Sequence, residues 1–216
     1  MTSLIDFILH IDQHLLDLVA NYHHWVYLFL FLIIFVETGL VIMPFLPGDS
    51  LLFATGMLAA QGANINVFTA IVILLVAAIL GDACNYFIGR YAGDRFLKMK
   101  LFGKQMVKPE YIAKTHEFYD KHGPQTIIIA RFVPIVRTFA PFVAGIGHMK
   151  YKTFTFFNIL GGSIWVIGIT LLGYFLGEIE IIKNNFEKVV FGIIIISVLP
   201  IIIGFIKSKK KKPITN

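Results

Sequence analysis

Long apolar runs, interrupted by charged and proline-containing stretches, dominate the pattern of the chain. Residues 67–89 and 153–177 are apolar over most of their length, and so are residues 189–206. Each run approaches or exceeds the ~20 helical residues that cross a bilayer. The pattern therefore predicts an all-α polytopic membrane protein, in which 189–206 is an additional C-terminal transmembrane helix.

Two further apolar regions contain breaks. Residues 25–42 are separated from the short apolar stretch 50–60 by prolines and a glycine, and residues 124–149 also contain prolines. Broken backbone is tolerated at membrane depth only inside protein or beside water. Each region therefore predicts a re-entrant hairpin of two half-helices. The residues expected to break the hairpins are Pro44, Pro47, Gly48, Pro134, Pro141 and Gly145.

Two amphipathic segments precede these broken regions. Residues 3–20 place acids and histidines on one helical face and aliphatic side chains on the other, and residues 109–123 alternate in a similar way. A helix with one apolar and one polar face is suited to the membrane surface. We therefore expect two surface helices.

The order of elements repeats along the chain. A surface helix, a broken hairpin and a span occur in residues 3–90 and again in 107–177. Each span ends in two glycines four residues apart, a small-xxx-small pair that permits close helix packing within one chain or in a homo-oligomer. These pairs are Gly89 with Gly93 and Gly173 with Gly177. We interpret residues 1–206 as a single membrane domain and 207–216 as a basic cytoplasmic tail.

The charge distribution orients these elements. The chain carries a net charge of +6, but no Lys or Arg precedes Arg90, so residues 1–89 carry −6 and residues 90–216 carry +12. Cytoplasmic loops are enriched in Lys and Arg. Residues 90–123 and the C-terminus are therefore expected inside, and residues 61–66 and 178–188 outside, with the N-terminal helix on the outer face. The two copies are then inverted, as in many transporters.

The hairpins carry the candidate chemistry. The first contains Glu37 and Asp49, and the second contains Arg131 and Arg137. A charge at the bilayer centre costs about 3 kcal/mol on insertion scales, so such residues usually pair or line a polar cavity. If the hairpin tips meet, the four residues could form ion pairs that only hold the hairpins together. Alternatively, the carboxylates exchange protons and the arginines bind an anion such as phosphate.

Several function classes remain open or are excluded by composition. The basic residues lie in loops beside apolar spans, so a nucleic-acid partner is not expected. The spans contain no Ser–His pair, no HExxH and no paired metal motif, so we expect neither an enzyme nor a metal or cofactor. Besides an anion transporter, the alternatives are a proton-coupled transporter of small ions or cationic drugs and a non-transporting membrane scaffold.

Several long motifs resemble those of one known family. ETGL, PFLPGDSLLFATG, GDACNYFIGR, KHGPQTIIIARFVPIVRTFAPFVAG and NILGGSIWVIGITLLGYFLG resemble the bacterial DedA membrane protein family, which shares the VTT domain with eukaryotic lipid scramblases. The likeness covers about residues 5–205. It implies a multi-pass protein of the bacterial cytoplasmic (inner) membrane, with two re-entrant loops of opposite orientation.

The resemblance also implies a function. The family supports membrane homeostasis and envelope integrity and depends on the proton motive force. The protein is thus expected to be a transporter or flippase of a phosphate-bearing lipid, either undecaprenyl phosphate or a phospholipid such as phosphatidylethanolamine. The essential acids of the family map onto Glu37 and Asp49, and its essential arginines onto Arg131 and Arg137. Secondary site residues are Asp82, Tyr86 and Arg90, of which the last two match an aromatic-xxx-basic element.

Overall fold

The computed structural model describes residues 25–40, 48–62, 65–98, 100–101, 104–105 and 109–179. The helices of the first half are α3 (Trp25–Gly39), α4 (Gly48–Ala60) and α5 (Val67–Lys98). Those of the second half are α6 (Pro109–His122), the 3-10 helix η1 (Gly123–Gln125), α7 (Thr126–Ala130), α8 (Pro134–Ile146) and α9 (Tyr151–Gly177). The strands β1 (Lys100–Leu101) and β2 (Lys104–Gln105) form a short antiparallel pair.

Within the described ranges, two helices are long and apolar enough to cross a membrane, and both belong to the predicted spans. They are Val67–Gly93 of α5 and Tyr151–Gly177 of α9. The prediction of a helical protein with long apolar helices is thereby confirmed, and α6 covers the second predicted amphipathic segment. The N-terminal helix expected at 3–20, the span expected at 189–206 and the tail at 207–216 lie outside the described residues.

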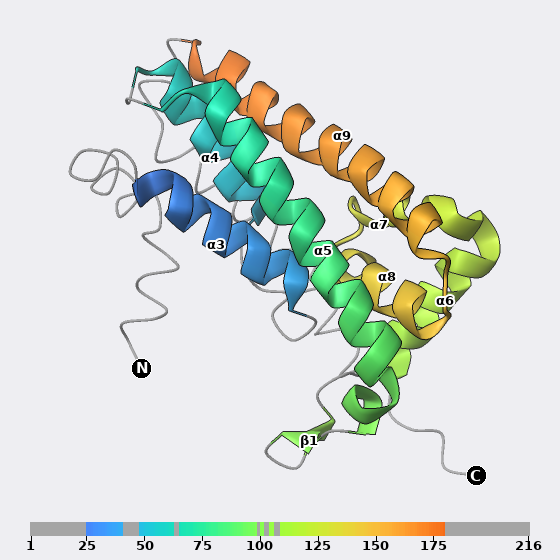
Figure 1. Ribbon diagram of the computed structural model, residues 1–216. Helices are drawn as coiled ribbons and strands as arrows, with labels where there is room; N and C mark the ends of the chain where they lie inside the picture. Colours follow the sequence, from blue (N-terminus) through green and yellow to red (C-terminus); the bar gives the residue numbers. More distant parts are fainter. Residues whose placement is uncertain are drawn as a thin grey trace, which may run out of the picture.

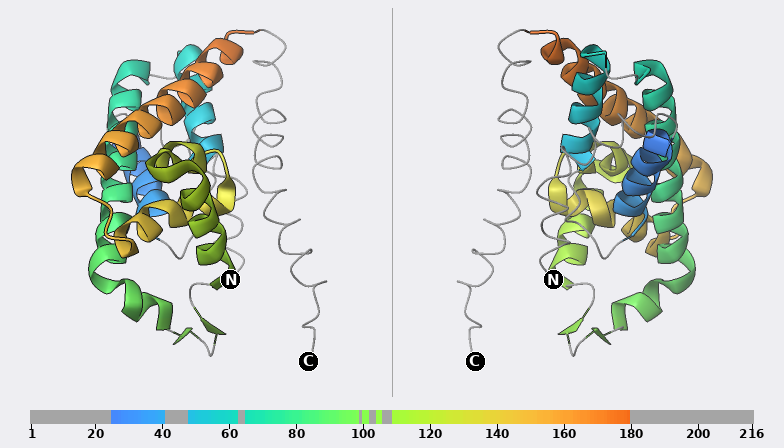
Figure 2. Two further views of the ribbon diagram at one scale, coloured as in Figure 1. Left: turned by 90° about the vertical axis from the view of Figure 1, so that its right-hand side faces the viewer. Right: turned by 90° about the vertical axis from the view of Figure 1, so that its left-hand side faces the viewer.

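The helices pack around α5. This helix contacts α3, α8 and α9, while α4 lies along α9 (Figure 1). The turned views show α4 near the end where α5 begins, and α8 near the end where α5 finishes (Figure 2). The N-termini of α4 and α8 therefore lie between these two ends, where the charged residues gather.

Apolar side chains face both inward and outward. The main core joins α3, α4, α5 and α9 through Leu30, Ile34, Leu52, Leu74 and Trp165. Other large apolar side chains point away from the protein, among them Phe68, Phe156 and Phe175, which are 76%, 62% and 62% exposed. An apolar outer surface of this extent is typical of a protein whose helices contact lipid.

Close helix contacts depend on glycines. Between α4 and α9, a Cβ on Gly56 would overlap the carbonyl oxygen of Thr170, and a Cβ on Gly173 would overlap that of Phe53. Both overlaps are with backbone, which cannot move aside as a side chain would. The glycines therefore set the distance between these helices.

The α5–α8 contact is built in the same way. A Cβ on Gly145 would overlap the carbonyl oxygen of Tyr86, and a Cβ on Gly89 would overlap that of Phe142. The small-xxx-small glycines at the ends of both spans thus lie at contacts within the chain.

Substitution of Gly173 by alanine is expected to destabilise the α4–α9 contact. Overpacking typically lowers the free energy of unfolding by about 1–3 kcal/mol. Gly168 on the same helix is the matched control, because a Cβ there would meet nothing within 4 Å. Gly168→Ala should be neutral or stabilising by up to about 1 kcal/mol, since alanine favours helix. Thermal unfolding in detergent measures both; equal losses would contradict the role assigned to Gly173.

The break in the second predicted hairpin is not where the prolines alone would put it. Residues 131–133 separate α7 from α8, and Pro134 is the first residue of α8, where a proline costs no helical hydrogen bond. The prediction that Pro141 and Gly145 break this region is wrong, because both lie inside α8. One lost backbone bond at Pro141 is tolerated where a packed neighbour such as α5 supports the helix.

The first predicted break is only partly visible. Gly48 is the first residue of α4, and α3 ends at Gly39. Pro44 and Pro47 lie outside the described residues. The helices α3 and α4 have 15 and 13 residues, so each is shorter than the ~20 residues that a helix needs to cross a bilayer.

Candidate functional site

Five charged side chains from the middle of the protein form two adjoining groups. In the first group, Arg137 of α8 donates a hydrogen bond of 2.6 Å from Nη2 to Glu37 Oε1 and one of 2.8 Å from Nη1 to Asp49 Oδ1. Glu37 lies near the end of α3 and Asp49 in the first turn of α4. The guanidinium of Arg137 therefore joins α8 to α3 and α4, whose acids lie 100 and 88 residues earlier in the sequence.

Trp165 of α9 completes the first group. Its indole Nε1 donates a 2.7 Å hydrogen bond to Asp49 Oδ1. The Arg137 guanidinium carbon lies 4.3 Å from the centre of the indole ring, close enough for a cation–π contact. The same oxygen of Asp49 thus accepts from an arginine and a tryptophan, which fixes its orientation.

The second group is centred on Arg131. Its Nη2 donates to Asp82 Oδ2 in a salt bridge and, at 2.6 Å, to Asn158 Oδ1. Asn158 in turn donates from Nδ2 to the carbonyl oxygen of Ile79, at 3.1 Å. Asp82 and Ile79 belong to α5 and Asn158 to α9, so Arg131 connects the two long apolar helices.

A buried amide links the hairpin regions without any charge. Asn85 Nδ2 donates to the carbonyl oxygens of Thr38 and Thr138, at 3.2 and 2.9 Å. These carbonyls lie one residue after Glu37 and one residue after Arg137. Asn85 therefore holds the backbones that present the first ion pair.

The two groups differ in their exposure. The side chains of Arg131 and Asp82 are 4% and 8% exposed, whereas that of Asp49 is 38% exposed. Within the described part of the chain, no hydrogen-bond partner lies at Glu37 Oε2 or at Arg131 Nε. The Glu37–Asp49–Arg137 group thus combines a buried carboxylate with one that is partly exposed.

Glycines make room for these charges. A Cβ on Gly48 would overlap the Glu37 carboxylate, so only glycine fits at this position while Glu37 keeps its place. A Cβ on Gly161 of α9 would lie 3.1 Å from Arg131 Nε. The small residues of the sequence motifs therefore create the space in which the carboxylate and the guanidinium lie.

The sequence left open which acid faces which arginine. The structure places both predicted acids, Glu37 and Asp49, on Arg137, and pairs Arg131 with Asp82, which the sequence marked only as secondary. The arrangement of two acids facing two arginines is therefore replaced by three acids facing two arginines.

Other predicted and unpredicted residues lie around this site. Tyr86 and Arg90 bind each other in the C-terminal half of α5, through a 2.7 Å hydrogen bond from Arg90 Nη1 to the Tyr86 hydroxyl, outside both groups. Sequence reasoning missed Trp165, Asn85 and Asn158. Their signal was present, since an amide or an indole N–H in an apolar span needs a partner.

The chemistry available to these residues is proton exchange and anion binding. In the described residues, no group of three or more His, Cys, Asp or Glu side chains could hold a metal ion. The three carboxylates can accept protons, and the two guanidiniums can bind an oxyanion through paired N–H groups.

Comparison with known proteins places the chain in a family. The VTT domain family model matches residues 46–175. Protein DedA of Escherichia coli K12 is 53% identical over 208 residues, which cover 96% of this chain and 94% of that protein. The chain belongs to the DedA family. The resemblance noted in the sequence motifs is thereby confirmed.

Other DedA relatives are named as membrane proteins. An uncharacterised membrane protein of Mycobacterium leprae is 44% identical over 172 residues, covering 80% of this chain and 76% of the relative. The inner membrane protein YqjA of Escherichia coli K12 is 34% identical over 178 residues, covering 82% and 80%. No solved structure matches the chain. Together with its long apolar helices, these names identify the chain as a DedA family membrane protein.

Proposed function

We propose that the protein is a proton-motive-force-dependent transporter or flippase of a phosphate-bearing lipid in the bacterial inner membrane. The observation that carries this proposal is the sharing of one arginine, Arg137, by Glu37 and Asp49. A phosphate and these carboxylates compete for the same guanidinium. Protonation of either acid weakens its pairing with Arg137 and makes N–H groups available to an oxyanion.

The charge balance of the site supports coupling to protons. The three carboxylates and two guanidiniums carry one excess negative charge when all are ionised. An anionic phosphate is repelled by this state and attracted once two protons have been bound. Proton binding and phosphate binding therefore favour each other, which is the requirement for coupled transport.

The exposure of the first group suggests a path for protons. Asp49 is partly open, while Glu37, on the same arginine, is buried. A proton that reaches Asp49 from water can pass to the adjacent Glu37 when Arg137 moves between its partners. In this scheme Arg131, held by Asp82 and Asn158, forms the buried positive wall of the site.

An inverted repeat of re-entrant hairpins is part of this proposal, and the glycine contacts support it. Gly56 of α4 lies against the carbonyl of Thr170, three residues before Gly173 of α9. In the same way, Gly145 of α8 lies against the carbonyl of Tyr86, three residues before Gly89 of α5. The contacts are reciprocal: Gly173 lies against the carbonyl of Phe53, three residues before Gly56. Gly89 lies against the carbonyl of Phe142, three residues before Gly145. Equivalent contacts in the two halves are expected of a repeat.

Cysteines at Asn64 and Lys104 should react from opposite sides of the membrane, in a Cys84→Ser background. The expectation follows from the charge distribution, which places residues 61–66 outside and residues 90–123 inside. Labelling of intact cells with a membrane-impermeant maleimide, followed by lysis and a second label, measures it. Equal accessibility from one side would contradict the inverted arrangement.

A scaffold is the second candidate, because each arginine of the site is already paired with a carboxylate. Reconstitution into liposomes with a labelled lipid phosphate tests the two candidates directly. A transporter moves undecaprenyl phosphate or phosphatidylethanolamine between leaflets faster with an imposed pH gradient than without one. With a scaffold, the rate of lipid movement equals that of protein-free liposomes, both with and without the pH gradient.

A further inference from the structure

A basic pocket lies apart from the buried charges, toward the C-terminal end of α5. Its cavity is about 530 Å³, within the usual range for ligand sites. It is lined by Tyr86, Phe87, Arg90, Tyr91, His148, Lys150, Tyr151 and Lys152. Arg90 follows Asp82 by eight residues on α5, which corresponds to about 12 Å along the helix. The pocket is therefore separate from the site of the proposed function.

The position of the pocket is that of a membrane–water boundary. The apolar part of α5 ends at Gly93, and α9 begins at Tyr151, so both long apolar helices have an end here. Tyr91 and Tyr151 are 80% and 43% exposed. Exposed aromatic side chains at the ends of spans are typical of the lipid headgroup region.

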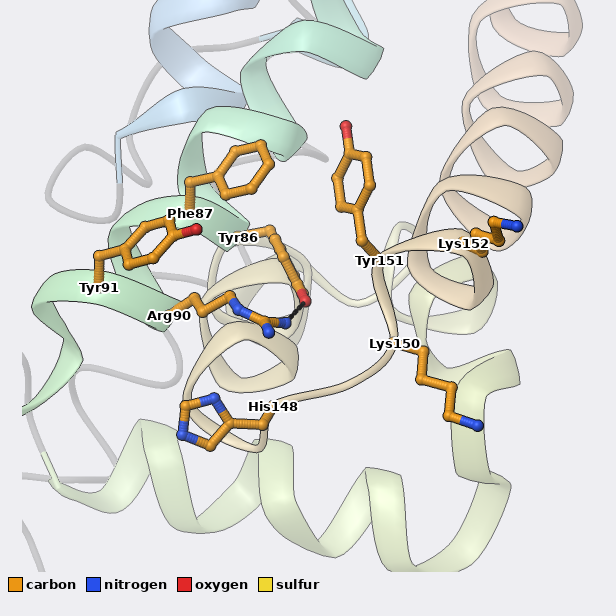
Figure 3. A pocket seen from close by; sticks show the side chains of 8 residues that line it. All are labelled: Tyr86, Phe87, Arg90, Tyr91, His148, Lys150, Tyr151 and Lys152. Atoms are coloured by element: carbon orange, nitrogen blue, oxygen red, sulfur yellow. Dashed lines mark hydrogen bonds between the residues drawn. The ribbon is translucent and has the colours of Figure 1, made fainter.

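The lining is suited to an anion. Among the described residues, the lining includes one arginine, two lysines and a histidine, and no carboxylate. Arg90 uses Nη1 for the Tyr86 hydroxyl and the Met149 carbonyl, and none of its bonds to described residues involves Nε or Nη2. Figure 3 shows Arg90 and His148 on the same side of the pocket, with the amino groups of Lys150 and Lys152 directed away from Arg90. Arg90 and His148 are therefore the inner partners, and the lysines belong to the rim.

His148 occupies a backbone conformation that disfavours any side chain. Its φ is 52°, the left-handed region in which glycine is usual. It ends α8 through a hydrogen bond to Gly145 O, and the following Met149 N–H bonds Ala144 O, as in a Schellman cap. Gly147, one residue earlier, adopts an ordinary negative φ. Strain retained at a cap where glycine would fit better is characteristic of functional sites.

We infer that this pocket binds the phosphate of an anionic membrane lipid through Arg90 and His148, with the lipid tails along the exposed aromatic side chains. The inference goes beyond the proposed transport function and does not depend on it. A lipid is favoured over a soluble anion because the apolar side of the pocket consists of Phe87, Tyr91 and Tyr151 at the ends of the spans. Tyr86 positions the guanidinium, since its hydroxyl accepts from Arg90 Nη1 and itself bonds the Met149 carbonyl.

Native mass spectrometry of the purified protein in detergent, titrated with phosphatidylglycerol or phosphatidylcholine, tests the inference. The protein should bind phosphatidylglycerol about tenfold more tightly than phosphatidylcholine. Arg90→Gln and His148→Gly should each remove most of that tenfold preference, as expected for the loss of one charge-assisted hydrogen bond. The control Lys114→Gln, an exposed lysine of α6 outside the pocket, should leave it unchanged.

His148→Gly keeps the test valid if Arg90→Gln does not fold. Glycine accepts the left-handed conformation, so the thermal stability of lipid-free protein should be kept or raised while the lipid preference falls. A purely structural role for His148 predicts no change in lipid preference. Arg90→Gln and His148→Gly both leave Glu37, Asp49 and Arg137 unchanged, so a loss of preference in either variant places lipid binding in this pocket rather than at the proposed transport site.

Three outcomes would overturn the inference. The first is a preference for phosphatidylglycerol that survives both Arg90→Gln and His148→Gly. The second is displacement of the lipid by excess inorganic phosphate, which identifies a soluble-anion site. The third is an equal loss in Lys114→Gln, which places lipid binding elsewhere on the protein.

Discussion

Replacement of Arg137 by glutamine should abolish transport and lower the free energy of unfolding by about 3–5 kcal/mol. Arg137 is the described cation that contacts both Glu37 and Asp49, and Glu37 is buried. Its removal leaves a carboxylate without a partner in a medium where isolated charges are costly. Thermal unfolding in detergent and lipid transport in liposomes measure the two effects on the same preparations.

Arg137→Lys is the control that separates charge from geometry. Lysine keeps the positive charge but cannot bind two acceptors with a planar fork. It should therefore recover part of the stability while transport stays far below that of the wild type. Unfolding of Arg137→Gln at the wild-type temperature would contradict the pairing described above.

Asp82→Asn should also destabilise the protein by about 3–5 kcal/mol, because it leaves the buried guanidinium of Arg131 with neutral hydrogen-bond acceptors and no carboxylate partner. Asp49→Asn is the matched change at a partly exposed acid. Arg137 keeps Glu37 in that variant, and Trp165 can still donate to the amide oxygen, so the cost should be about 1 kcal/mol or less. Chemical or thermal unfolding in detergent compares the two.

The double variant Asp82→Asn/Arg131→Gln tests the same ion pair by removing both of its charges. Removal of both charges eliminates the unpaired guanidinium, so much of the lost stability should return. That result would assign the Arg131 group a structural role, in which it holds α5 and α9 together. Equal costs for Asp82→Asn and Asp49→Asn would show that burial does not distinguish the two groups.

The periodicity of the sequence was sufficient to predict the long helices and the broken apolar regions. Apolar runs of span length identified α5 and α9, and amphipathic spacing identified α6. The position of the second break was only partly predictable. Pro134 begins a helix, as prolines often do, but Pro141 is accommodated inside the same helix because α8 packs against α5. Tertiary support of this kind has no signal in local sequence.

The pairing of charges was beyond sequence reasoning for a geometric reason. Glu37 and Arg137 are 100 residues apart, and their contact depends on where α3 and α8 lie around α5. Asp82 was visible as an acid in an apolar span, which by itself predicts a partner. Nothing in its spacing shows that the partner is Arg131 rather than Arg137.

The central claim, that Glu37 and Arg137 act on a proton and a phosphate rather than only on each other, is tested most directly by one mutant cycle. Wild type, Glu37→Gln, Arg137→Gln and the double variant are compared for thermal stability and for movement of labelled undecaprenyl phosphate in liposomes with a pH gradient. The account predicts that the double variant regains stability and stays inactive. Restored transport in the double variant would contradict it and leave an ion-paired scaffold as the explanation.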